Sequence, residues 1–291
     1  PNHTITVPTY VEHFAHDKKA DSMDWSCLKN IGIGGDYFSE ESELYVNDFL
    51  KKHNSSSIAE KGYGMTENSS TAGVCLVGVN KINSLGIPLP LNTYGIFKRG
   101  TSEELKYGEE GEICITGPTE MLGYLNNDEE ESKVIKVHND GKKWIHSEDI
   151  GLIDEDGFLF FKGRYKRIIP HGGFKLYPAY IEGVIIGHPN VDKCCVISIP
   201  SEIYGASPEA HVVIKKEQVK ELEKIKKELI ELCKDKLPSY SQPEDFIFEE
   251  DLPLTSVGKI DYKQVEKTRI KILYISSILF ITNYIFTINM H

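Results

Sequence analysis

The 291-residue sequence is short of basic charge and of paired cysteines. Lys and Arg number 33 against 44 Asp and Glu, which gives a formal net charge of −11. A general nucleic-acid binder needs a basic face to neutralise phosphates, so this balance argues against that class. The six cysteines form no Cys-x-x-Cys pair and are too dilute for a disulfide framework. They favour a reducing compartment, and we therefore expect a cytoplasmic protein.

Uncharged segments long enough to cross a membrane are also scarce. The one candidate, Ile272 to Met290, approaches the roughly 20 residues that a membrane helix needs, and Arg269 and Lys271 precede it. Against an anchor, Asn283 and Asn289 lie within it, and its Ile-rich composition fits an appended peptide. We expect no membrane association, with the 272–290 tail as the one route to it.

Segments with helical spacing and segments with strand-like patterns both occur along the chain, as in a packed α/β protein. The spacing of Leu44, Phe49 and Leu50 predicts a helix from Glu40 to His53. The run from Ile150 to Phe161 reads as a β-hairpin with an acidic, glycine-containing turn.

The pattern of the sequence changes near Lys166. Strand-like runs follow at Cys194–Ile199 and His211–Ile214, and then a charged helix is predicted from Lys216 to Lys236, stopped by Pro238. The fold class is therefore α/β with a β-rich end, followed by a small α+β domain.

Three segments carry candidate chemistry. In the segment 62–67, glycines flank Tyr63, and Thr66 and Glu67 could reach a phosphate-bound metal. Asp149 and Arg164 lie at opposite ends of the predicted hairpin and could converge on one ligand, the first suiting ribose hydroxyls and the second an anionic oxygen. Taken alone, the first segment reads as a plain loop and the second pair as a surface ion pair.

The third segment is the loop 252–261, in which Lys259 follows Gly258. A lysine there is a cation that can meet developing negative charge. It is not a phosphate-binding loop of the Gly-Lys-Ser/Thr type, because Ile260 follows the lysine. An isolated loop lysine is more often simply solvated.

In this order, the three segments resemble the adenylate-forming superfamily of acyl-CoA synthetases, luciferases and peptide-synthetase adenylation domains. The resemblance runs from about Leu28 to about Glu266. It implies that residues 1–165 are the C-terminal portion of the large AMP-binding domain and that 166–267 are the small mobile C-terminal domain. Residues 268–291 are then an apolar tail of uncertain status.

The resemblance also implies roles for individual residues. In that family a carboxylate attacks the α-phosphate of ATP to form an acyl-adenylate, and a thiol, commonly of CoA, then displaces AMP. Tyr63, next to Gly64, would stack on adenine, Thr66 would touch the phosphate, and Glu67 would help to hold Mg²⁺. Asp149 would bind the ribose hydroxyls, with Arg164 assisting.

Further family positions lie in the glycine turns and in the second domain. Gly35 belongs to a turn that is similar to the one beside the acyl pocket. Lys259 would bridge the carboxylate and the α-phosphate, and Lys166 occupies the hinge between the domains. Gly172 and Gly173 would line the pantetheine tunnel.

With Met65, the segment 62–67 resembles the form found in acyl-CoA ligases. The resemblance therefore favours a CoA ligase for an organic or fatty acid. The sequence departs from the family pattern at two points, and these leave other functions open. Glu148 stands where the family has glycine, and no Ser/Thr/Gly-rich phosphate-gripping loop is found. We therefore expect the back portion of a longer enzyme, cut before Pro1, that needs its N-terminal portion for turnover. The alternatives are a non-catalytic nucleotide-binding or interaction module, and an adenylation enzyme that acylates a carrier protein.

Overall fold

The computed structural model describes the backbone of residues 2–216, 221–256 and 258–288, with side chains up to residue 275. The chain divides into two compact units, Pro1–Arg167 and Ile168–His291, and each is described here by itself. The boundary expected between residues 165 and 166 lies two residues before this division.

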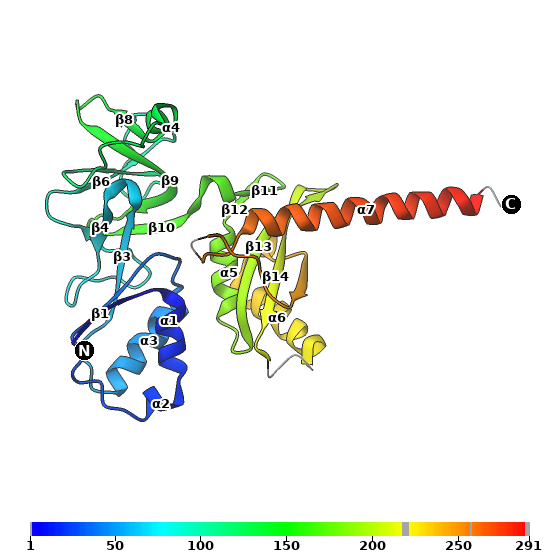
Figure 1. Ribbon diagram of the computed structural model, residues 1–291, viewed down its shortest axis with the longest axis horizontal. Coiled ribbons are helices and arrows are strands. Elements are labelled where there is room, and N and C mark those ends of the chain that lie inside the picture. Colours follow the sequence, from blue (N-terminus) through cyan, green and yellow to red (C-terminus); the bar gives the residue numbers. More distant parts are fainter. Residues whose placement is uncertain (1, 217–220, 257, 289–291) are drawn as a thin grey trace. The chain divides into compact units, whose positions relative to one another are not determined.

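One sheet of the first unit is built on the N-terminal part of the chain (Figure 1). Its order is β1 (His3–Thr6), β2 (Asn30–Ile33), β3 (Ala59–Met65), β4 (Ser70–Val74) and β5 (Ile87–Pro88). The first three strands are parallel, and β3, β4 and β5 are antiparallel. The helices that accompany this sheet are α1 (Pro8–His16), α2 (Lys18–Asp21) and α3 (Glu40–Lys52).

Helix α3 confirms the helix predicted from residue 40, but not all of its predicted apolar face. Ser39 caps its first turn by accepting a hydrogen bond from the backbone N–H of Ser42. Phe49 and Leu50 are buried as the spacing predicts, whereas Leu44 is 49% exposed. Glu43 is fully buried on this helix because it has a cationic partner, Lys61 of β3.

The other sheet of the first unit has the order β10-β9-β7-β6, with β8 paired to β9. The strands are β6 (Thr93–Phe97), β7 (Gly111–Thr116), β8 (Ile135–Val137), β9 (Lys143–Ile153) and β10 (Leu159–Arg164), and α4 (Asp128–Val134) precedes β8. The pairing of Leu159 with Ile153 confirms the predicted hairpin. Gly157 adopts φ +85° in its turn, which favours glycine.

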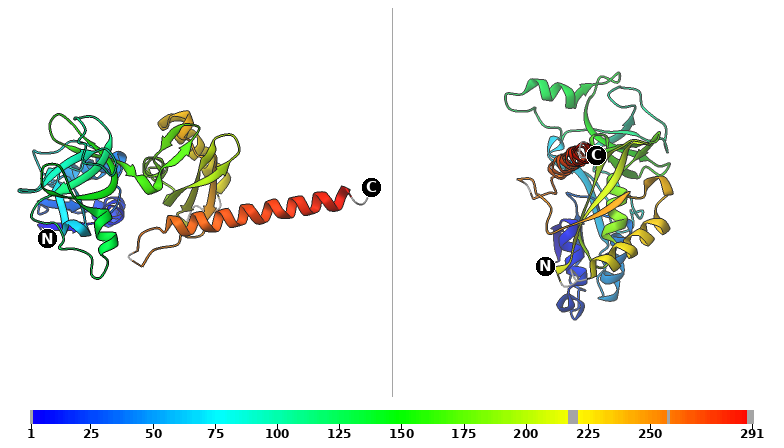
Figure 2. Two further views of the ribbon diagram at one scale, coloured as in Figure 1. Left: turned by 90° about the horizontal axis from the view of Figure 1, so that it is seen from above. Right: turned by 90° about the vertical axis from the view of Figure 1, so that its right-hand side faces the viewer.

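The second unit is a sheet of order β12-β11-β14-β13, with β15 paired to β14. Its strands are β11 (Ile169–His171), β12 (Phe174–Leu176), β13 (Val191–Ser201), β14 (Gly205–Ile214) and β15 (Asp245–Glu249). The helices α5 (Pro178–Ile186) and α6 (Leu222–Lys236) cover one face, and α7 (Tyr262–Ile288) packs on the other (Figures 1 and 2). Cys194 belongs to the first of these cores and Cys195 to the second, as strand alternation requires.

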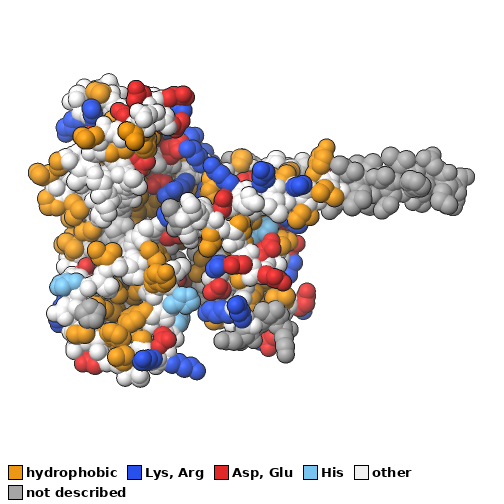
Figure 3. Space-filling model, in the orientation of Figure 1, with side chains coloured by type: hydrophobic (Ala, Val, Ile, Leu, Met, Phe, Trp, Pro, Cys, Tyr) orange, Lys and Arg blue, Asp and Glu red, His pale blue; other side chains and the backbone are white. Residues whose placement is uncertain are grey.

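Helix α6 bears out the end of the helix predicted to stop before Pro238, while residues 217–220 lie outside the described part. Acidic and basic side chains are interspersed over the second unit in the view of Figure 3, as expected for a surface of mixed charge. The mixed α/β architecture confirms the predicted fold class.

Helix α7 takes up most of the apolar tail and runs through the expected boundary at residue 268 without a break. Residues 289–291 and the side chains after residue 275 lie outside the described part. No helix among the described residues is both long and apolar enough to cross a membrane.

Candidate functional site

The carboxylate of Asp149 is the centre of the candidate site in the first unit. Its side chain is 8% exposed, and the Tyr63 hydroxyl donates to its Oδ2 at 2.9 Å. Nε of Arg164 lies 3.0 Å from Oδ1, and the Arg164 side chain is 61% exposed. The structure therefore brings together three residues that are up to 101 positions apart, from strands β3, β9 and β10.

Local pairing explains why these side chains meet. Asp149 and Arg164 are register partners in the β9–β10 hairpin. The backbone N–H of Asp149 donates to Oγ of Ser147 at 3.0 Å, and that hydroxyl donates to the carbonyl of Ile113 in β7 at 2.6 Å. Ser147 therefore positions Asp149, although the motif alone did not single it out.

Tyr63 is buried rather than presented as a free ring. Its ring makes an edge contact with Tyr94, with centroids 6.1 Å apart. Burial raises the pKa of Tyr63 well above its ordinary value, and the Asp149 carboxylate raises it further. The hydroxyl is therefore a proton donor at neutral pH, and the stacking on adenine stays a prediction.

Thr66 and Glu67 begin a short 3₁₀ turn, Thr66–Asn68, directly after β3. Thr66 is exposed and Glu67 is half-buried. The Tyr124 hydroxyl donates to Oε1 of Glu67 at 2.5 Å, and burial, followed by this contact, raises the pKa of Tyr124 to about 12. Tyr124 is thus a positioning residue for Glu67, signalled in the sequence only by the Gly-Tyr-Leu-Asn run at 123–126.

The glycines of the first unit differ in what they require. A Cβ on Gly64 would lie 1.7 Å from the carbonyl oxygen of Ser70, so no side chain fits between β3 and β4 there. Gly35 has φ +91° in the turn after β2, and the neighbouring Gly34 faces the backbone of Gly62. The turn at residues 34–35 therefore lies beside the segment 62–67.

Glu148, which departs from the family pattern, has φ +58° and pairs through Oε2 with Nζ of Lys166 at 2.5 Å. Both side chains are substantially exposed, so the pair adds little stability by itself. The expected hinge residue therefore contacts the residue that precedes Asp149.

The remaining predicted residues belong to the second unit. Gly172 and Gly173 form the turn between β11 and β12, with φ +54° and +90°. A Cβ on Gly173 would meet nothing within 4 Å, so open space adjoins this turn. Lys259 is exposed on a turn in which the backbone N–H of Thr255 donates to its carbonyl at 2.7 Å.

Comparison with known proteins identifies the family of this chain. The family model "AMP-binding enzyme" matches residues 1–125, and "AMP-binding enzyme C-terminal domain" matches residues 180–259. A probable 4-coumarate–CoA ligase 2 of Dictyostelium discoideum is 34% identical over 264 residues, which are 90% of this chain and 46% of the relative. A long-chain-fatty-acid–CoA ligase of Bacillus subtilis is 32% identical over 255 residues, covering 87% and 43% of the two chains.

Solved structures show the same likeness. The crystal structure of the anthranilate CoA ligase AuaEII with anthranoyl-AMP superposes with a TM-score of 0.80 at 23% identity, covering 94% of this chain and 51% of that one. The o-succinylbenzoate CoA synthetase of Bacillus subtilis gives 0.77 at 25% identity, covering 91% and 50%. The chain spans about half the length of the relatives that it matches. With both family models matched in order along the chain, the protein belongs to the AMP-binding, adenylate-forming enzyme family.

Proposed function

We propose that this chain carries part of the site of an acid–CoA ligase, which activates a carboxylic acid with ATP and transfers the acyl group to CoA. The observation that carries the proposal is the buried Asp149 carboxylate, held between Tyr63 and Arg164. The named activities of the relatives, CoA ligases for aromatic and long-chain acids, support it.

The contacts of Asp149 suit a ribose with two adjacent hydroxyls. A ribose hydroxyl would replace an existing partner of the carboxylate. Arg164 is the partner that can leave at low cost, because its side chain is already largely in water. Tyr63 would then keep the other oxygen in place.

The half-buried carboxylate of Glu67 fits a magnesium ion. Mg²⁺ binds through one or two carboxylates and substrate phosphates while it keeps several waters, and a carboxylate with solvent access allows this. When bound, the ion would offset charge on the phosphates. Tyr124 would hold Glu67 in position, and Thr66 would offer its exposed hydroxyl to a phosphate oxygen.

The second unit would supply the catalytic lysine and the path by which the CoA thiol reaches the acyl group. Lys259, exposed on its turn, would approach the carboxylate and the α-phosphate during adenylation. The open space beside Gly173 would admit the pantetheine arm of CoA. Because the sequence holds no phosphate-gripping loop, we propose that turnover needs a polypeptide that supplies one, corresponding to the N-terminal portion of the relatives.

Nucleotide binding by the chain itself tests the first part. We would titrate AMP and its 2′,3′-dideoxy analogue by calorimetry, with Asp128→Asn as the control because Asp128 is exposed at the start of α4. Losing hydrogen bonds to a charged group should weaken AMP binding by about 10- to 100-fold in Asp149→Asn. Equal affinities for AMP and the analogue in the unaltered chain would contradict a ribose role for Asp149.

Reconstitution tests the reaction. The chain would be mixed with a separately produced N-terminal portion, and acid-dependent pyrophosphate release and CoA consumption would be measured across aromatic and fatty acids. Lys259→Ala should abolish acyl-adenylate formation, whereas Lys263→Ala, an exposed lysine on α7, should not.

The outcomes separate the alternatives. AMP binding without any turnover in the reconstituted mixture would favour a nucleotide-binding module. Acyl transfer to carrier-protein thiols but not to CoA would favour the adenylation enzyme. We also propose a cytoplasmic location, because the sequence has no Cys-x-x-Cys pair and five of its six cysteines are buried.

A further inference from the structure

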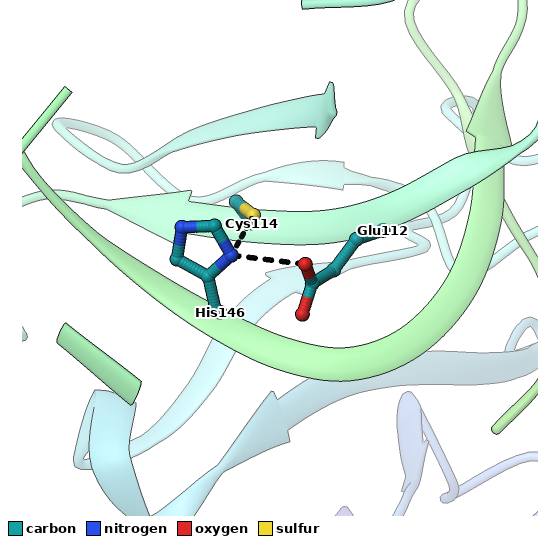
Figure 4. Close-up of side chains that lie close together, drawn as sticks. All are labelled: Glu112, Cys114 and His146. Carbon is teal, nitrogen blue, oxygen red and sulfur yellow. Dashed lines mark hydrogen bonds and ion pairs between the residues drawn. The ribbon is translucent and has the colours of Figure 1, made fainter. Parts of the chain in front are cut away.

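A buried cluster of possible metal ligands lies in the first unit, apart from the residues assigned above. It consists of Glu112 and Cys114 on β7 and His146 on β9 (Figure 4). Glu112 and Cys114 are two residues apart on one strand, and Cys114 is the register partner of His146. All three are at most 3% exposed.

The ligand atoms converge on one point. Nδ1 of His146 lies 2.9 Å from Oε2 of Glu112 and 3.5 Å from Sγ of Cys114, and all three atoms lie within 4.8 Å of one another. Around a tetrahedral Zn²⁺ ion, bond lengths of 2.0–2.3 Å separate such ligand atoms by about 3.3–3.6 Å. The nitrogen–sulfur distance already fits, and the nitrogen–oxygen distance needs to widen by about 0.4 Å.

A second layer of contacts orients these ligands. The backbone N–H of Gly100 donates to Oε2 of Glu112 at 3.0 Å, and that of Glu148 donates to Oε1 at 3.2 Å. Nε2 of His146 lies 2.9 Å from Nε2 of His138. Outer contacts of this kind fix the ring and tautomer of a metal-bound histidine.

His138 supplies an independent observation. It is 7% exposed, and its Nδ1 is buried with no hydrogen-bond partner among the described residues. Phe97 and Trp144 pack against its ring and shield this side of the cluster from water. The histidine pair therefore ends in an unsatisfied atom, which leaves it able to carry its proton on either nitrogen.

We propose that Glu112, Cys114 and His146 are three ligands of a buried zinc site, in which a water molecule would take the fourth tetrahedral position. With both rings neutral, His146 starts with its proton on Nδ1 and His138 with its proton on Nε2. On binding, the ion takes the place of the Nδ1 proton, His146 then carries a proton on Nε2 that it donates to His138, and His138 carries its own on Nδ1. The Cys114 thiol releases one proton to solvent.

The charges in this arrangement balance. The carboxylate and the thiolate together cancel the two positive charges of the ion, so the buried site is neutral. The ion would join β7 to β9, and through the Glu112 carboxylate it would reach the backbone at Gly100 and Glu148. Binding of the ion would not require the chain to have the proposed ligase function.

Cobalt substitution tests the proposal on the full chain. Co²⁺ bound to a thiolate gives a near-ultraviolet charge-transfer band that carboxylate and imidazole ligands do not give. All samples would carry Cys27→Ser, because Cys27 is exposed. We expect one equivalent of Co²⁺ with this band in the parent, and the same in the control Cys75→Ser, whose thiol is also buried in the first unit.

Cys114→Ser should lose the band, with Cys114→Ala as a second variant, and circular dichroism would verify that each is folded. His138→Gln should weaken Co²⁺ binding by about 10- to 100-fold while keeping the band. Zn²⁺ should displace Co²⁺ and raise the melting temperature of the parent. Absence of the band in the folded parent, or its persistence in Cys114→Ser, would overturn the proposal in favour of a hydrogen-bonded network alone.

Discussion

Replacing Lys61 by Met would remove one partner of a fully buried ion pair. Lys61 and Glu43 side chains are 3% and 0% exposed, and Nζ lies 2.5 Å from Oε2 of Glu43. That oxygen also accepts the backbone N–H of Asn83 at 2.8 Å, while Oε1 is buried without a partner among the described residues. The substitution therefore leaves a buried carboxylate with one remaining hydrogen bond.

Breaking a buried pair in this way costs about 3–5 kcal/mol, because the remaining charge is uncompensated. Removing both charges in the double variant Glu43→Leu/Lys61→Met should restore most of the loss, since apolar replacements of buried pairs are often neutral. With a urea dependence of about 2 kcal/mol per molar, the single variant should unfold about 2 M earlier.

The two tryptophans make the assay specific. Trp25 and Trp144 both belong to the first unit, so tryptophan fluorescence in urea follows the unfolding of that unit. Lys52→Met is the matched control, because Lys52 pairs with Asp48 on the exposed side of α3. A urea midpoint for Lys61→Met equal to that of Lys52→Met would refute the reasoning. A double variant less stable to urea than the single variant would also refute it.

Gly64→Ala should destabilise the first unit by about 1–3 kcal/mol, since its Cβ would overlap the Ser70 carbonyl, and the same fluorescence measurement checks this. Glu148→Gly should stabilise that unit by about 0.5–1 kcal/mol by relieving a positive φ, whereas Glu148→Ala, which keeps the backbone strain, should not. In the second unit, burial alone would raise the pKa of Glu209, but hydrogen bonds from His211 and Arg269 hold it below its ordinary value of 4.5. The stability that this carboxylate adds is therefore complete above pH 4.5 and is lost as the pH falls through the lower folded pKa. A carbon NMR titration of Glu209 should show this low pKa, and Arg269→Gln should raise it; an unchanged pKa in the variant would contradict the assignment.

Periodicity and turn chemistry predicted the local elements well. The helix from residue 40 and the hairpin at 150–161 follow from patterns a few residues long, and the structure confirms both. The inner face of α3 was harder to predict, because hydrophobicity marks Leu44 and not Glu43. Only the presence of Lys61 on a neighbouring strand makes the buried glutamate favourable, and that neighbour is 18 residues away.

In the candidate site, too, contacts within a short segment could be predicted from the sequence, whereas contacts between distant strands could not. The order of the motifs placed Asp149 and Arg164 together, and their hairpin register agrees. The sequence did not predict the cluster of Glu112, Cys114 and His146, because its members meet across two strands at a separation of 32 to 34 residues. The alternation Gly-Glu-Ile-Cys does put Glu112 and Cys114 on one face, but no local pattern reveals which strand faces them.

The hydrogen bond from the backbone of Glu148 to Glu112 has an evolutionary consequence. Within four residues, β9 contains both His146, buried against Glu112, and Asp149, the buried carboxylate of the nucleotide candidate site. A substitution at position 112 would thus remove a contact to the backbone next to Asp149, although Glu112 is not among the residues proposed to contact the nucleotide. Positions 112 and 146, whose side chains contact each other, should accordingly change together between lineages, whereas position 148 contributes only its backbone N–H.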